Sequence, residues 1–410
     1  MRRLLVLLAL AACAPGLSPA ATQGLAAALQ RRGLALQADD PAAPSTDLAG
    51  LRALVGGARV VGLGQPGAGT RELPRVVHRV LRYLVEETGF TGLALDADAS
   101  AGLALDAYAQ GGAVDIDAAL LALGDRGLAT VELRELLTWV RTHNAAGRGA
   151  PVRVFGVDPR DPEAAAAVVL TYLGRVDPSY VPEARSLLAG GQQLAVESVL
   201  ARLDALRAAL PADEAAAWSV ARQQAEVVAQ ARRMAETWEF EAGEFARARN
   251  IEWALAQLGP RGKLLVWASN RRIAAEVPGA APSMGNFLRQ WLGADYRPIA
   301  VSFAGGELLA PADPDLLCPA PIAPPRPGSL DAALAGPGMP RALLDLRGLA
   351  EPGLRAPQVL RSLDGARAED TRLRPALAFD AVLGLQRVSP ARPLGATPAA
   401  RAGCVRVPAN

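Results

Sequence analysis

The chain has 410 residues, of which 51% are hydrophobic and 20% are charged. This composition favours a folded chain with one large domain or two to three smaller ones, and it excludes an intrinsically disordered protein. The formal net charge of +2 is spread along the chain without long runs. The sequence therefore lacks the basic footprint of a nucleic-acid-binding protein, and no nucleic-acid partner is expected.

Residues 1–21 have the pattern of an export signal. Two arginines precede an unbroken apolar run over residues 4–12, which has the length of a signal-peptide core and is too short to span a bilayer. The run ends in a lipobox-like Leu-Ala-Ala-Cys, which predicts lipidation of Cys13; cleavage near residues 19–21 is the alternative. We expect an exported protein of the cell envelope or periplasm, held at the membrane only by a lipid on Cys13.

The body of the chain alternates strand and helix signals. After a first helix near residues 23–36, helical spacing of apolar residues recurs at 73–88 and 130–143. Short apolar runs predict five strands, at 58–63, 91–95, 152–157, 263–268 and 298–303. This alternation predicts an α/β fold with a mostly parallel sheet flanked by helices.

Two segments depart from that rhythm. Residues 181–258 are rich in Ala, Leu, Glu and Arg and predict a helical insertion between the third and fourth strands, placed as a lid or second lobe. The main α/β domain is expected to span residues 22–310. Residues 311–410 form a Pro-rich extension expected to pack on that domain, with irregular chain at 312–328 and 389–410.

Cysteine usage agrees with export. Without Cys13, the chain keeps the even pair Cys318 and Cys404. In a compartment that permits disulfides we predict a bond between them; two buried free thiols are the alternative.

Polar residues gather where the predicted strands end. Ligands of open parallel sheets bind beyond the carboxyl ends of the strands, so these residues are candidates for a site. The turn after the first strand, 64–72, is Gly-rich but fits neither the dinucleotide fingerprint nor a phosphate loop. The candidate pocket residues are Gln65, Thr70, Arg71, Glu72, Asp96, Asp158 and Asn270.

Several collinear motifs resemble those of the erythromycin esterase family. The turn with Gly64, Gly69, Thr70 and Glu72 leads into Val-Glu-Glu-x-Gly-Phe at 85–90. Leu-Leu-Thr-Trp-Val-Arg-Thr-His-Asn at 136–144, Val152 to Asp158, Asn250-Ile-Glu-Trp253 and Trp267-Ala-Ser-Asn270 follow in the same order, so the likeness covers roughly residues 50–306. The resemblance implies a histidine that acts as general base on the water that opens a macrolide lactone, with glutamates alongside and no cofactor.

The sequence departs from this family at the positions that carry its chemistry. A positioned general base contributes ~10²–10⁴ in rate; alanine carries no proton, and glutamine cannot ionise. The family's glutamates fall at Gln65 and Asp96. Its base histidine falls at Ala68, and two further histidines fall at Ser269 and Arg272. The Met and Asp of a later helix fall at Arg247 and Glu244.

Three functions follow as hypotheses. The favoured one is a degenerate relative that keeps the family cleft for binding a small molecule; no protein partner is predicted. The first alternative is an active hydrolase that uses Asp96 with Glu72, or a metal held by Asp96, Asp98, Asp158 and Glu72; the second is a purely structural protein. An ion-pair network of Arg71, Glu72 and Asp96 is favoured over a metal, and His78 and His143 are expected to be structural.

Overall fold

The computed structural model covers most of the chain. The export segment before residue 19, and Cys13 with it, lie outside the described residues. The structure describes residues 19–190, 193–237, 239–335, 339–350, 352–364, 367–368 and 371–408.

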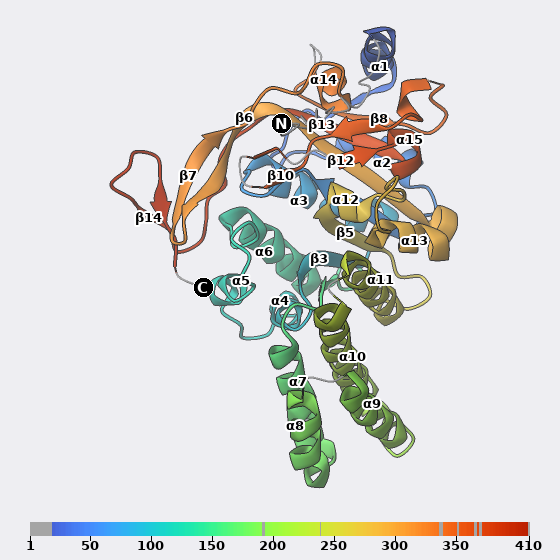
Figure 1. The fold of residues 1–410 in the computed structure, drawn as a ribbon, viewed down its shortest axis with the longest axis vertical. Coiled ribbons are helices and arrows are strands. Elements are labelled where there is room, and N and C mark those ends of the chain that lie inside the picture. The colour runs from blue at the N-terminus through green and yellow to red at the C-terminus, as the bar shows by residue number, and fades with distance from the viewer. Residues whose placement is uncertain are drawn as a thin grey trace, which may run out of the picture.

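The core is one large sheet that confirms the predicted α/β class (Figure 1). All five predicted strands form, as β2 (Val60–Gln65), β3 (Gly92–Asp98), β4 (Arg153–Asp158), β5 (Leu264–Ser269) and β6 (Tyr296–Asp313). They lie parallel in the order β6-β2-β5-β3-β4. Because β5 sits between β2 and β3, the ends of three strands from distant parts of the chain converge on one edge.

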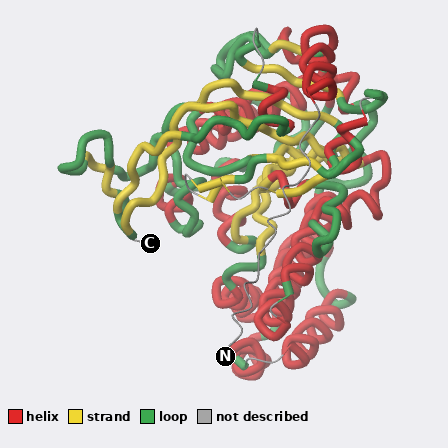
Figure 2. Tube along the Cα trace, turned by 45° about the horizontal axis from the view of Figure 1, so that its top comes forward, coloured by secondary structure: helices red, strands yellow, loops and turns green. Residues whose placement is uncertain are grey.

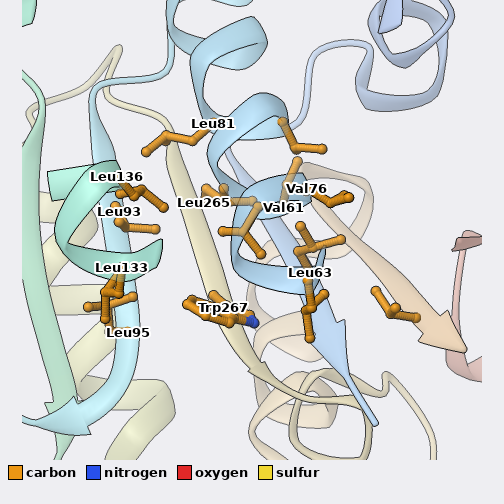
Figure 3. Packing of buried hydrophobic residues seen from close by; sticks show 14 of the residues in the cluster. Val61, Leu63, Val76, Leu81, Leu93, Leu95, Leu133, Leu136, Leu265 and Trp267 are labelled. Atoms are coloured by element: carbon orange, nitrogen blue, oxygen red, sulfur yellow. The ribbon is translucent and has the colours of Figure 1, made fainter. Parts of the chain in front are cut away.

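Helices cover both faces of this sheet. Val61, Leu63 and Trp267 point to one face, against α3 and α6 (Figure 3). That face carries α2 (Leu51–Val55), α3 (Glu72–Thr88), α4 (Ala101–Ala109), α5 (Ile116–Leu121) and α6 (Val131–Ala145). The other face carries α1 (Pro19–Arg32), α11 (Phe240–Gln257), α12 (Asn270–Ile273), α13 (Met284–Leu292), α14 (Leu330–Leu334) and α15 (Pro375–Ala378).

Local sequence signals set the ends of the two helices nearest the site. The backbone at Gly89 is left-handed, with φ of 74°, which ends α3 with a residue that tolerates this conformation. The Thr130 hydroxyl accepts a bond of 3.2 Å from the Leu133 amide and caps the start of α6. Short 3₁₀ turns connect other elements, at Thr46–Leu48, Pro178–Tyr180, Ala212–Glu214, Gly293–Asp295 and Pro352–Leu354.

The helical insertion forms a lobe with a core of its own, and it extends away from the sheet (Figure 1). The lobe begins with α7, before the predicted residue 181. α11, the last helix of the predicted insertion, packs on the sheet and is not part of the lobe. The lobe helices are α7 (Pro162–Val176), α8 (Val181–Ala189), α9 (Gln193–Arg207) and α10 (Ala215–Thr237).

The segment after residue 310 adds strands that the sequence analysis did not predict. β13 (Ala381–Val388) pairs parallel to β6, and β8 (Arg341–Asp345) pairs antiparallel to β13. β1 (Leu34–Ala35), from the start of the chain, pairs antiparallel to β8 at the edge of the sheet. The proposed boundary at residue 310 falls inside β6, which continues into the region expected to be irregular and pairs there with β7 (Leu316–Pro321). The remaining short strands are β9 (Gln358–Leu360), β10 (Leu363–Asp364), β11 (Arg367–Ala368), β12 (Thr371–Leu373), β14 (Thr397–Pro398) and β15 (Val405–Arg406).

A disulfide joins Cys318 to Cys404, as predicted, across 86 residues of chain. Cys318 belongs to β7, and β15 pairs with β7 beside it. The end of β6 and β7, residues 305–321, project from the sheet as a two-stranded ribbon that we call the arm (Figures 1 and 2). The disulfide and a small cluster of Leu309, Leu317 and Val407 attach the C-terminal region to this arm.

Among the residues that the structure describes, every helix is too short or too polar to span a bilayer.

Candidate functional site

A small cavity lies beyond the carboxyl ends of β2, β5 and β3, where the sequence predicted a site. We call this cavity of about 120 Å³ the well. Four predicted positions line it: Gln65, Ala68, Asp96 and Ser269. The indole of Trp267 also lines it, at the end of the apolar layer beneath, next to Leu63 and Leu95 (Figure 3).

An ion-pair network closes one side of the well. Asp96 pairs with Arg272 at short range and lies 3.4 Å from the Nε of Arg247. Arg247 also donates to Asp158 at 2.8 Å, which brings together residues 89 positions apart. The side chain of Arg247 is 7% exposed and that of Asp158 is 3% exposed, so both charges are almost fully removed from water.

Glu244 completes the network from α11. Its carboxylate, which is inaccessible to solvent, accepts from Arg272 at 3.1 Å and from Arg247 at 3.3 Å. It also accepts from the backbone amide of Met284 at 3.0 Å, the first residue of α13. One carboxylate thus connects the edge of the site to two helices of the sheet's other face.

The charges of the network shift the pKa values of two of its members, Asp158 and Arg272. Burial alone would raise the pKa of Asp158, but Arg247 and Arg160 more than offset it and hold that pKa below its ordinary value. Burial alone would lower the pKa of Arg272, whereas Asp96 and Glu244 raise it further above its ordinary value. Asp158 therefore remains ionised and Arg272 remains charged within the network.

The predicted ion-pair network exists with other partners. Asp96 pairs with arginines from α11 and α12, whereas Arg71 is exposed and Glu72 accepts from the amide and hydroxyl of Ser389 at 2.7 and 2.5 Å. The prediction of Arg71 and Glu72 as partners of Asp96 was wrong because Glu72 is occupied by the segment that follows β13. Glu72 serves to attach that segment to the start of α3.

Three other candidate residues are held by the backbone around them. Asn270 bridges β5 to β6, donating to the Val301 carbonyl at 2.7 Å and accepting from the Val301 amide at 2.9 Å. Asp98 accepts from the amides of Ser100, Ala101 and Asp161, at 2.8 to 2.9 Å. Thr70 is buried in a bridge to Pro390. The side chains of Asn270 and Asp98 therefore organise the backbone around the site, and Thr70 contributes through its backbone bridge.

The sequence analysis did not predict two charged residues that line the well, Asp125 and Arg160. Asp125 comes from the loop between α5 and α6, and Arg160 follows β4 by two residues. Arg160 donates to Asp158 at 2.9 Å, on the side opposite Arg247. The polar Asp-Arg-Gly turn at 125–127 could have suggested a site residue. The sequence does not show that this loop lies beside the ends of β2 and β3.

The well opens into a wider depression of about 620 Å³, which we call the groove. The two share Ala68, Asp125, Gly127 and Arg160. The arm forms the far wall of the groove through Leu309, Pro311, Pro314 and Leu317. Among the described residues, no cluster of His, Cys, Asp and Glu has the arrangement of a metal site.

Both histidines lie away from the well. His78 of α3 packs against Trp139 of α6 with ring centroids 5.5 Å apart, and His143 stacks on the same indole at 5.3 Å. His143 also lines a cavity with Thr91 and Gly262, at the amino-terminal edge of the strands. Neither imidazole is positioned to take a proton at the opposite edge.

Comparison with known proteins places the chain in a family. The profile of the erythromycin esterase family matches residues 85–388, about three quarters of the chain. The chain belongs to the erythromycin esterase family. The matched region begins after the turn at 64–72.

Solved structures show the same fold. A Bacillus cereus protein is 22% identical, with a TM-score of 0.82 over 91% of this chain and 99% of that one. A succinoglycan biosynthesis protein gives 22% identity and a TM-score of 0.79 over 92% and 99% of the two chains. A histidine-to-asparagine mutant of the erythromycin esterase EreC, in its open conformation, gives 18% identity and a TM-score of 0.66 over 84% and 94%.

Proposed function

We propose that this member of the erythromycin esterase family has lost the family's hydrolytic chemistry and uses its cleft to bind a small molecule. One observation carries the proposal: two arginines engage Asp96, a carboxylate that lines the well, at positions where the family's pattern has other residues. Asp96 pairs with both Arg247 and Arg272, which hold its carboxylate in the ion-pair network at one side of the well. Ala68 and Ser269 supply no group that exchanges a proton near neutral pH.

The size of the well agrees with this proposal. A cavity of about 120 Å³ is below the ~300–1,000 Å³ of typical ligand sites, whereas the adjoining groove of about 620 Å³ falls within that range. A ligand would therefore occupy the groove and extend only a small group into the well.

A lactone-hydrolysis assay tests the loss of chemistry. We expect purified protein to open the erythromycin lactone no faster than buffer. The variant Ala68→His, Gln65→Glu, Ser269→His should gain turnover, toward the ~10²–10⁴-fold that a general base provides. Its melting temperature and circular dichroism show whether it keeps the fold. Hydrolysis by the unmodified protein that disappears in Asp96→Ala would instead establish the carboxylate mechanism.

Export to the envelope is the second part of the proposal. It rests on the N-terminal apolar run and on a disulfide, a bond typical of oxidising compartments. We expect the protein to fractionate with membranes, and Cys13→Ser to shift it to the soluble periplasmic fraction. Equal membrane association of Cys13→Ser would contradict the lipid anchor.

A further inference from the structure

We infer that the groove binds an amphiphile with an anionic head group, a carboxylate or phosphate ester joined to an acyl chain. The inference names the ligand class of the proposed binding function and rests on it. It depends on two features of the groove: an apolar wall and a charged wall.

The arm supplies the apolar wall. Pro311 and Pro314 are exposed, and Leu309 and Leu317 lie beneath them, all along one side of the groove. Leu363 and Pro393 add apolar surface from two other segments. Removing such surface from water is worth ~25 cal/mol per Å², so an acyl chain along this wall would gain free energy from burial.

The opposite wall carries the charge. Arg126 lines the groove, half-buried, and no ion pair joins it to any of the residues that the structure describes. Arg160 uses one nitrogen on Asp158, while its side chain is 45% exposed and keeps further donors for a ligand. Asp125 is the one carboxylate of this wall, and its Oδ1 accepts from the Gly127 amide at 2.8 Å. Arg160 is already paired with Asp158, so Arg126 is the guanidinium of this wall that has no ion-pair partner among the described residues. A planar guanidinium suits a carboxylate or a phosphate.

Glycines allow the segments that line the groove to pack closely. Gly69 has φ of 83°, and a Cβ there would lie 2.2 Å from the Leu309 carbonyl oxygen. A Cβ at Gly127 would lie 2.4 Å from the Cβ of Ala68. Ala68 therefore packs directly against Gly127, and Gly69 packs against the backbone of the arm. Arg160 lines both the groove and the well, so a head group in the groove can reach it.

The disulfide fixes the apolar wall. Cys318 lies next to Leu317 in β7, and its bond to Cys404 holds the arm to the C-terminal region. Reduction would remove that covalent attachment and leave the β7–β15 pairing and the small cluster around Leu309 to hold it. Binding of the acyl chain is thus expected to depend on the oxidised state of the protein.

Calorimetric titration of the purified oxidised protein, below the critical micelle concentrations, tests this inference. The probes are decanoate, decyl phosphate and decyltrimethylammonium, which share one chain and differ in head group. We expect both anions to bind at least tenfold more tightly than the cation, and their ratio distinguishes a fatty acid from a phospholipid-like source. Arg126→Ala should weaken anion binding at least fivefold, Arg126→Lys should restore most of it, and reduction should weaken it severalfold.

The matched control is Arg148→Ala, in the separate cavity at the other edge of the sheet, which should bind the anions like the unmodified protein. Equal binding of cation and anion, or an unchanged affinity in both Arg126 variants, would overturn the ligand class. Binding of erythromycin without hydrolysis, in place of decanoate, would overturn the inference and leave the proposed binding function standing. Erythromycin hydrolysis by the unmodified protein would overturn the proposed function itself.

Discussion

Replacing Glu244 by alanine is expected to lower the free energy of unfolding by about 3 kcal/mol. Its carboxylate is inaccessible to solvent and accepts from Arg247, Arg272 and the Met284 amide. Removing one partner of a buried ion pair costs about 3–5 kcal/mol, because the remaining charge stays buried without compensation. The loss should fall at the low end of that range, since Arg247 retains Asp158 and Arg272 retains Asp96.

The same helix offers a matched control. Glu252 of α11 pairs with Arg249, and both side chains are about half exposed. Exposed ion pairs contribute about 0–1 kcal/mol, so Glu252→Ala should change stability little. Chemical denaturation of both variants measures the difference. Equal losses in the two would show that Glu244 does not hold the network together.

Charge pairing explains how so many ionised groups remain buried beside the well. Arg247 and Arg272 place positive charge next to Asp96, Asp158 and Glu244. Each arginine engages at least two of these carboxylates, so neither sign is left uncompensated. Each member therefore has a second partner when one is removed, which limits the cost of a single substitution to the low end of the range for a broken buried ion pair.

The sheet was predictable because its strands have a local signature. Each of the five predicted strands is a short apolar run that is buried on both faces, as expected for a parallel sheet. β13 carries the same signature, Ala-Val-Leu-Gly-Leu, but it stands among Pro- and Arg-rich segments that suggested irregular chain. The arm was missed because Pro311 and Pro319 lie in its strands, and proline is tolerated there only because the ribbon is at an edge.

The candidate site was predictable only in part. Residues at strand ends, such as Gln65, Asp96 and Ser269, converge because parallel strands share an edge. The contacts of Asp96 were not predictable, because its partner Arg247 lies on α11, the last helix of the predicted insertion. Glu72 illustrates the same limit: its partner Ser389 is 317 residues away, and only the fold of the C-terminal region brings them together.

A buried imidazole should make the protein sensitive to acid. His78 is 5% exposed, and neither ring nitrogen has a hydrogen-bond partner among the described residues. Burial lowers the pKa of His78 to about 4, and the nearby positive charges of Arg82 and Arg75 contribute in the same direction. The folded protein therefore holds His78 neutral, at a pH where the unfolded chain already binds a proton.

The sign of the resulting pH dependence is fixed by that difference. Between pH 6.5 and about 4 the unfolded state carries the extra proton, so stability is complete above pH 6.5 and is lost on acidification. The contribution of His78 should fall by roughly 2 kcal/mol between pH 7 and pH 5. We expect His78→Leu to lack this loss, and to be more stable at pH 5 because it removes two unpartnered polar atoms from the core. His143→Leu, on the same indole but partly exposed, controls for the lost ring contact with Trp139. An identical acid dependence in His78→Leu and the unmodified protein, measured by denaturation at both pH values, would mean that His78 is accessible to protons in the folded state.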